Sequence, residues 1–270
     1  MARTIVFLSD FGYRNEWVGI CHAVIDKIAP ESHVVDLSHG VPPLDVRAGA
    51  LLLADSLPYI RHDAVVLAIV DPSVGRDRDI ALRTGDGRLF VGPDNGLFAP
   101  AWRASEGVAE AVAITAGEVL IEPVSPSLHA RDILAPGAAH LAAGQSLDFL
   151  GSAIEPGTLA DLHVPEPEIE PGKVSGEVLD VNRFGNVELN VRASHLAAAG
   201  LDQHELIAVD ALSGRAIAKR VSTYADLEQG DWGVMVDPRG WLAVIRGNPA
   251  NAAAGLGVGS EDLVWLSRAD

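Results

Sequence analysis

Short apolar runs alternate with amphipathic segments along the first part of the chain. The run at residues 64–70 is continuously apolar and rich in β-branched residues, which is typical of a strand buried on both faces of a parallel sheet. Residues 1–164 are therefore predicted to form a layered α/β domain with a mainly parallel sheet. The expected elements are strands at residues 4–8, 33–37 and 64–70 and helices at residues 17–28 and 45–57.

The pattern changes after a segment of three prolines and three glutamates at residues 165–172, which suits a semi-rigid linker. Short alternating runs separated by turn residues follow, as expected of a small antiparallel barrel. We predict a C-terminal β-barrel domain over residues 173–270. Of the two alanine-rich stretches, the one around Leu141 in the first domain is expected to be a helix and the one around Ala252 in the barrel a loop. The expected strands are residues 173–181, 186–191, 206–210, 232–236 and 242–246.

Composition narrows the classes of partner. The 270 residues are 48% hydrophobic, enough for a sizeable core, and the net charge of -17 repels phosphate backbones. Nucleic acid is therefore not an expected partner. The single cysteine, Cys21, excludes an internal disulfide and favours a cytoplasmic location. The apolar run near the amino terminus is too short for a signal peptide or a membrane span, so no membrane is expected.

The most informative polar segment directly follows the run at residues 64–70. Asp71 and Arg78 lie seven positions apart in a loop rich in turn residues. Loops that leave the carboxyl ends of parallel strands line the ligand crevice of open α/β sheets. Asp10 follows the first expected strand, so we expect Asp10 and Asp71 to be neighbours at one edge of the sheet. The competing interpretation is that Asp10 only caps the following helix.

Three further loops of the first domain carry candidate groups. His129 precedes an apolar helical stretch, and the N–H groups of a helix start favour a neutral imidazole that can accept a proton. Taken alone, His129 is better explained by a structural role. His39 lies in a proline-rich strand exit, where a structural hydrogen bond is the simpler interpretation. Asn95 belongs to an Asn-Gly pair that turn chemistry alone explains.

The second domain offers two polar turns, one containing Asn182 and Asn186 and the other containing Arg246 and Asn248. An asparagine amide both donates and accepts, as an adenine edge requires, although each turn is also adequately described as a hairpin or loop. A metal site is not expected, because the groups that could converge lack the spacing of a zinc or two-metal motif. Those groups are Asp10, His22, His39, Asp71 and His129.

Seven short motifs occur in a fixed order along nearly the whole chain. They are Ser-Asp-Phe-Gly at 9–12, Asp-Leu-Ser-His-Gly-Val-Pro-Pro at 36–43, Val-Asp-Pro-Ser-Val-Gly at 70–75 with Arg78, Gly-Pro-Asp-Asn-Gly at 92–96, His-Ala-Arg-Asp at 129–132, Arg-Phe-Gly-Asn at 183–186 and Arg-Gly-Asn at 246–248. No single motif is specific, but the set resembles the S-adenosylmethionine hydroxide adenosyltransferases, relatives of the fluorinase and chlorinase enzymes.

The resemblance implies an N-terminal α/β domain and a C-terminal β-barrel. It also implies a homotrimer that holds S-adenosylmethionine or adenosine between neighbouring subunits. The implied reaction is hydrolysis of S-adenosylmethionine to adenosine and methionine without a cofactor. Asp71, Arg78 and His129 match the set that distinguishes the hydrolytic branch. The substrate-binding positions that the resemblance implies are Asp10, Phe11, Asn15, Trp17, Asn95, Asn182, Phe184, Asn186, Arg246 and Asn248.

Two of these positions depart from the family pattern, because Asn15 and Asn182 stand where relatives usually carry aspartates. An asparagine still accepts a hydrogen bond but forfeits the charge-assisted part. We predict that His129 accepts a proton from water, Arg78 holds the resulting hydroxide and Asp71 orients Arg78 or the water. The alternatives are halide transfer to the same carbon and a non-catalytic nucleoside-binding or sensor protein, which the two asparagines suggest.

Overall fold

The computed structural model describes residues 2–269, and the chain divides into two compact units, Met1–His163 and Val164–Asp270. The first unit is built on a seven-stranded sheet of order β2-β1-β3-β5-β4-β6-β7. Its strands are β1 (Ile5–Ser9), β2 (Val34–Ser38), β3 (Val65–Ile69), β4 (Asp79–Thr84), β5 (Leu89–Pro93), β6 (Val108–Ile114) and β7 (Gly151–Ile154).

The prediction of a mainly parallel sheet holds for one half of the sheet only. Strands β2, β1, β3 and β5 pair in parallel, whereas β4, β6 and β7 pair antiparallel. A tight turn at residues 85–88 joins β4 to β5, and so short a connection can only join antiparallel neighbours. This antiparallel half brings the start of β4 beside the end of β5, with Asp79 opposite Pro93.

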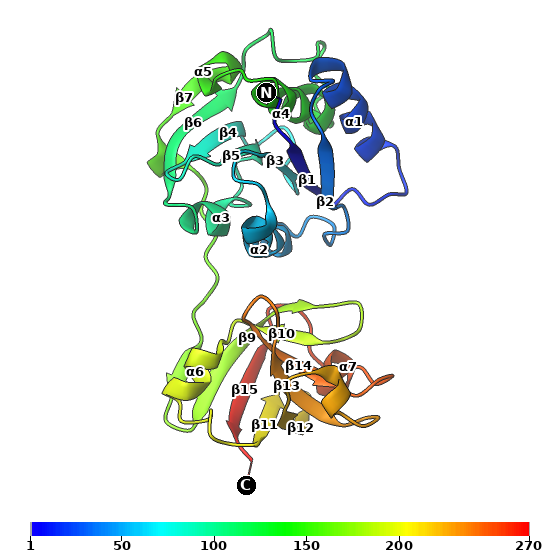
Figure 1. Ribbon diagram of the computed structural model, residues 1–270, viewed down its shortest axis with the longest axis vertical. Helices are drawn as coiled ribbons and strands as arrows, with labels where there is room; N and C mark the ends of the chain where they lie inside the picture. Colours follow the sequence, from blue (N-terminus) through cyan, green and yellow to red (C-terminus); the bar gives the residue numbers. More distant parts are fainter. Residues whose placement is uncertain (1, 270) are drawn as a thin grey trace. The chain divides into compact units, whose positions relative to one another are not determined.

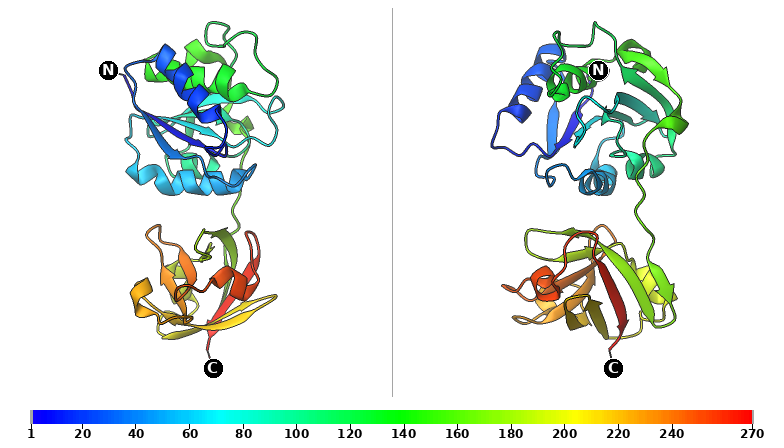
Figure 2. Two further views of the ribbon diagram at one scale, coloured as in Figure 1. Left: turned by 90° about the vertical axis from the view of Figure 1, so that its right-hand side faces the viewer. Right: turned by 180° about the vertical axis from the view of Figure 1, so that it is seen from behind.

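Helices cover both faces of this sheet (Figures 1 and 2). Alternate strand residues enter two separate cores, so Phe7 and Leu67 belong to one core and Leu8 and Ala68 to the other. One face packs against α1 (Trp17–Ile28), a π-helical turn (Ala130–Leu134), α4 (Ala135–Ala142) and α5 (Leu147–Leu150); the other packs against α2 (Val46–Ser56), the 3-10 turn η1 (Leu57–Tyr59) and α3 (Ala99–Arg103).

The second unit is a closed barrel, seen from three directions in Figures 1 and 2. Its strand order is β9-β10-β14-β13-β12-β11-β15, and β15 pairs with β9 to close the ring. The pairs are antiparallel except β12 with β13. The strands are β9 (Lys173–Val181), β10 (Val187–Leu189), β11 (Leu206–Ala211), β12 (Arg215–Arg220), β13 (Trp232–Val236), β14 (Leu242–Arg246) and β15 (Leu263–Arg268).

Two local predictions need correction. Part of the expected linker is strand β8 (Glu168–Glu170), which pairs with β9. The expected loop around Ala252 is helix α7 (Ala252–Leu256), because Asn251 caps it by accepting a 2.8 Å hydrogen bond from the Ala254 N–H. The remaining short elements are η3 (Pro156–Thr158), α6 (Ala193–Ala198) and η4 (Tyr224–Asp226). Within residues 2–269, no helix has the length and apolarity needed to cross a membrane.

Candidate functional site

A pocket of about 390 Å³ opens in the first unit where β1 and β3 end. It brings together Asp10, Asp71 and His129, which come from three separate loops. The expectation that Asp10 and Asp71 are neighbours at one sheet edge agrees with this lining. Mostly apolar side chains form the rest of the wall, namely Phe11, Trp17, Pro43, Leu44, Ile69, Val74, Leu128, Ala130 and Leu134, together with Ser127.

Asp71 stands two residues beyond the last residue of β3 and is half-buried. Its Oδ1 accepts a 2.8 Å hydrogen bond from the Ser73 N–H, which fixes the carboxylate at the start of the loop. Burial raises the pKa of Asp71, and the nearby charges of Asp77 and Asp10 raise it further, against the opposing effects of the Ser73 hydrogen bond and His129. A concentration of acidic groups in an apolar pocket favours a cationic ligand.

His129 is held by a carboxylate that sequence analysis missed. Its Nδ1 lies 2.7 Å from Oδ2 of Asp79, the first residue of β4. A carboxylate at Nδ1 favours the tautomer with its proton there, which leaves Nε2 as the acceptor. Nε2 faces the loop that follows Asp71, because a Cβ added to Gly75 would lie 3.8 Å from it. Burial raises the pKa of Asp79, while the charge and hydrogen bond of His129 oppose the rise.

Arg78 lies in a different polar cluster. Its Nε donates to Oδ2 of Asp94 at 2.8 Å, and its Nη2 donates to the carbonyl oxygen of Thr158 at 2.7 Å. The Asp94 carboxylate is buried and also accepts from the Ala160 N–H at 2.8 Å. Among the residues that the structure describes, Arg78 does not line this pocket. The structure therefore places Asp71 and His129 in one pocket, whereas Arg78 is bound to Asp94 and Thr158.

The other positions expected in the first unit divide into two groups. Phe11 and Trp17 line the pocket with their ring centroids 5.7 Å apart, whereas Asn15 is exposed and outside the lining formed by the described residues. The Asn95 side chain stabilises its own turn. It donates to the Val70 carbonyl at 2.8 Å and accepts from the Leu97 N–H at 3.2 Å.

The alternative role of Asp10 as a helix cap is wrong. Its Oδ2 accepts from the Leu44 N–H at 2.8 Å, while α1 begins after Glu16 without a side-chain cap. The Asp10 carboxylate therefore joins the loop after β1 to the loop before α2, and both loops border the pocket.

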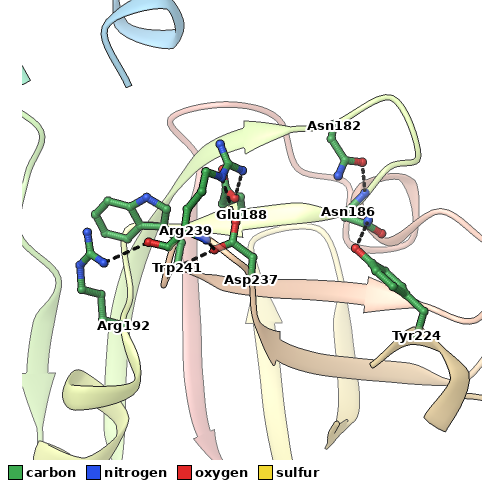
Figure 3. A network of polar contacts seen from close by, with 8 residues as sticks. All are labelled: Asn182, Asn186, Glu188, Arg192, Tyr224, Asp237, Arg239 and Trp241. Atoms are coloured by element: carbon green, nitrogen blue, oxygen red, sulfur yellow. Dashed lines mark hydrogen bonds and ion pairs between the residues drawn. The ribbon is translucent and has the colours of Figure 1, made fainter. Parts of the chain in front are cut away.

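A second pocket, of about 500 Å³, lies in the barrel. Asn186 enters it from the turn before β10 and donates from Nδ2 to the hydroxyl of Tyr224 at 3.1 Å (Figure 3). Tyr224 was not expected from the sequence, because it comes from the isolated turn η4. The wall consists of Phe184, Asn186, Tyr224, Leu227, Gln229, Arg246, Gly247, Asn248, Pro249 and Ala250.

Two polar side chains near this pocket differ in their availability. The guanidinium of Arg246 lies 4.6 Å from the ring centroid of Trp232, and its buried Nε has no hydrogen-bond partner. Asn182 is instead turned into its own loop, where Oδ1 accepts from the Phe184 N–H at 3.0 Å and from the Asn186 N–H at 3.2 Å. Figure 3 shows the second of these contacts. The asparagine at position 182, where the family pattern has an aspartate, thus stabilises its own turn.

A cluster of ionisable groups lies beside this region, at Glu188, Asp237 and Arg239 (Figure 3). Burial and a hydrogen bond to Asp237 raise the pKa of Glu188 to about 9, against the opposing charge of Arg239. Burial would also raise the pKa of Asp237, but its hydrogen bonds, first of all that from Glu188, lower it. These opposite shifts favour the protonated form of Glu188 and the charged form of Asp237 at neutral pH.

Comparison with known proteins gives these two pockets a context. The SAM hydroxide adenosyltransferase N-terminal domain matches residues 5–151, and the C-terminal domain of the same family matches residues 176–265. An (R)-S-adenosyl-L-methionine hydrolase of Salinispora tropica is 44% identical over 94% of both chains. A fluorinase of an Actinoplanes species is 28% identical over 94% of this chain and 96% of its own.

Solved structures agree with this result. The crystal structure of a conserved protein from Thermotoga maritima superposes with a TM-score of 0.90 at 30% identity, covering 98% of this chain and 100% of that one. The matched regions include both pockets, with Asp71 and His129 in the first and Asn186 and Arg246 in the second. The chain belongs to the SAM hydroxide adenosyltransferase family.

Proposed function

We propose that this chain hydrolyses S-adenosylmethionine to adenosine and methionine, using a water molecule activated in the first-unit pocket. Membership of the family and the 44% identity to an (R)-S-adenosyl-L-methionine hydrolase support the reaction. The observation that carries the mechanism is the hydrogen bond from His129 to Asp79. It holds Nδ1 at 2.7 Å from the carboxylate and leaves Nε2 as a base beside the loop of Asp71.

The proposed step is a displacement at the 5′ carbon of the sulfonium substrate. Nε2 of His129 takes one proton from water as the C5′–O bond forms. The C5′–S bond breaks, and its electron pair returns to sulfur, so that neutral methionine thioether leaves. Because the leaving group is neutral, the step needs no acid and no cofactor. A largely apolar wall replaces part of the hydration shell of the sulfonium, which favours a transition state in which its positive charge spreads from sulfur toward His129 as that residue takes the proton.

Asp71 and Arg78 have different parts in this proposal. Asp71 faces the pocket and orients the attacking water, and it adds negative charge near the sulfonium. Arg78 is committed to Asp94 and Thr158, and we propose that it holds the loop of Asp71 in place. A direct role for Arg78, in which it stabilises the hydroxide itself, is the competing proposal. A double-mutant experiment separates the two roles.

The barrel pocket is proposed to hold the adenine and amino-acid parts of the substrate. Asn186 and Asn248 supply amides suited to an adenine edge, Phe184 offers an aromatic face, and Arg246 carries an unpartnered buried Nε. We propose a homotrimer in which the first unit of one subunit and the barrel of its neighbour hold one substrate molecule. The family resemblance supports this arrangement.

The reaction is tested by incubating the protein with S-adenosylmethionine in ¹⁸O-labelled water and measuring the mass of the adenosine formed by mass spectrometry. Hydrolysis at the 5′ carbon predicts adenosine with one ¹⁸O atom. The similarity to fluorinases makes halide transfer the second candidate, so the assay is repeated with added chloride and fluoride. A 5′-halogenated nucleoside would favour halide transfer. Adenosine binding without any consumption of S-adenosylmethionine would favour a sensor.

A further inference from the structure

Three side chains that could bind a metal meet in the first unit, and none of them lines the first-unit pocket. His22 comes from α1, Asp36 from β2 and His39 from the loop after β2; α1 and β2 lie side by side in Figure 1. Oδ1 of Asp36 is 2.8 Å from Nε2 of His22 and 3.1 Å from Nε2 of His39. All three ligand atoms lie within 4.8 Å of one another.

His39 is the member of this cluster that a simple ion pair does not explain. Its side chain is fully buried, and its Nδ1 is 2.6 Å from the hydroxyl oxygen of Ser9. Its Nε2 is buried and lies close to Asp36 without the alignment of a hydrogen bond. An unsatisfied buried nitrogen is costly to the fold, so the position calls for a partner that approaches along the lone pair of Nε2.

We propose that His22, Asp36 and His39 bind a divalent transition metal of the Zn²⁺ class. Two imidazole nitrogens and one carboxylate oxygen suit zinc or cobalt, whereas magnesium and calcium prefer oxygen ligands alone. Zinc–nitrogen bonds of about 2.0–2.1 Å place tetrahedral ligand atoms roughly 3.3 Å apart. Small side-chain rotations reach that spacing from the observed positions, because two pairs are already closer and the third is within 4.8 Å.

The surroundings also suit a metal centre with three protein ligands. The hydroxyl of Ser9 lies 2.6 Å from Nδ1 of His39. With the proton on Nδ1, this contact holds the ring with Nε2 toward the metal, as outer partners of metal-bound histidines commonly do. The side chains of His22 and Asp36 are 35% and 28% exposed, so an ion can enter and water can complete its coordination. A metal binds the neutral imidazole and competes with protons for its nitrogen, so its affinity falls as the pH is lowered.

Such a metal would also stiffen one wall of the first-unit pocket. The carbonyl of His39 accepts a 2.7 Å hydrogen bond from the Gly12 N–H, and the Ser9 hydroxyl accepts from the Phe11 N–H at 3.3 Å. The loop that carries Asp10 and Phe11 is therefore attached at both ends to the metal-binding groups. The role is structural, and the proposal stands whether or not the pocket hydrolyses S-adenosylmethionine.

The test measures metal binding by the full chain, purified without a histidine tag and freed of metal by chelation. Zn²⁺ is titrated in competition with a chromophoric chelator, and Co²⁺ is added separately to record its visible absorption. We expect one tight Zn²⁺ per chain and the intense bands of low-coordinate cobalt. The His22→Ala and Asp36→Asn variants should each bind at least about 10–100-fold more weakly.

His62→Ala is the matched control, because His62 lies 3.4 Å from Asp86 in a pair that no third metal-ligating group among the described residues joins. It should bind as the wild type does. The side chains of His22 and His62 are both partly exposed, so the alanine variants should fold, which circular dichroism verifies. Equal Zn²⁺ affinity in the wild type and His22→Ala, or only the weak spectrum of hexa-aquo cobalt, would overturn the proposal.

Discussion

At the residue scale, the decisive side chain is His129. Its Nε2 is the base proposed to take the proton beside Asp71, so His129→Ala should lower kcat about 10²–10⁴-fold, which is the contribution of a typical general base. KM should change little, because the adenine and amino-acid contacts are proposed to lie in the barrel. Steady-state kinetics at pH 7–8 check this, with His62→Ala as the control. Unchanged turnover in His129→Ala would remove the residue from the mechanism.

Substitution of Asp79 should distinguish a role in positioning His129 from a role in stabilising the fold. Asp79→Asn keeps the shape of the side chain but no longer holds the tautomer of His129, so kcat should fall by up to the same factor as in His129→Ala. Because burial raises the pKa of Asp79, its stabilising contribution is largest at low pH and declines as the pH rises through its folded pKa. At pH 7 the neutral asparagine should therefore leave Tm unchanged or higher. Thermal unfolding and kinetics of the same preparation distinguish this from simple damage to the fold, in which both quantities would fall.

The residues around the first-unit pocket also show what could and could not be predicted from the sequence. Asp71 and Asp10 were predictable, because the ends of parallel strands meet at one edge. Asp79 was not, since its partner His129 lies 50 residues away and meets it only through the antiparallel strand β4. Asn182 was predicted to face the substrate, but an asparagine side chain also bonds readily to its own turn, and here it does.

At the element scale, the loop at residues 71–78 depends on its link to Asp94. Arg78→Ala leaves a buried carboxylate without its cation, which should cost about 1–3 kcal/mol and lower activity as the loop loosens. Adding Asp94→Asn to this variant removes the stranded charge and should restore most of the stability.

Urea unfolding and kinetics of both single variants and the double variant complete the test. Activity that returns together with stability supports the anchoring role of Arg78. Activity that stays about 10²–10³-fold low in a stable double variant would instead show that Arg78 stabilises the hydroxide directly.

In the barrel, the proton on Glu188 should make stability depend on pH. The pKa of Glu188 is raised to about 9 in the fold, so its contribution is full at low pH and is lost as the pH rises toward that value. Each pKa unit corresponds to about 1.4 kcal/mol, so the wild type should lose more than about 1 kcal/mol between pH 6 and 9. Glu188→Gln imitates the protonated form and should flatten this dependence. Urea unfolding across the range measures it, and parallel curves for the two proteins would contradict the assignment.

The elements themselves were largely predictable where their hydrophobic period was strong. The five strands expected in the barrel and the first three strands and two helices of the first unit all occur within a few residues of their predicted positions. Strand direction was not predictable in the same way, because the short apolar stretch at the centre of a strand such as β4 looks the same in either orientation. Short elements were missed for a related reason. The three residues of β8 form a strand because they pair with β9, and not because of a local hydrophobic pattern.

At the scale of the whole molecule, the chain separates its chemistry between two units. The groups proposed to activate water all belong to the first unit, whereas the amides and guanidinium proposed to bind the nucleoside belong to the barrel. Neither pocket alone combines a base with an adenine-binding edge. If the proposed function is right, both pockets contribute to one substrate molecule, and the two pockets belong either to one chain or to neighbouring chains.

Mixing two inactive variants decides between these possibilities. His129→Ala lacks the base, and a variant carrying Asn186→Ala and Arg246→Ala lacks the proposed nucleoside contacts, so each protein alone should be nearly inactive. If sites form between neighbours in a cyclic trimer, random reassembly of equal amounts joins an intact first unit to an intact barrel at about a quarter of the sites. Activity should then return to roughly that fraction of the wild type after co-refolding, with light scattering reporting the mass of a trimer. Sites contained within single chains would stay inactive in every mixture, because each chain carries one of the two defects.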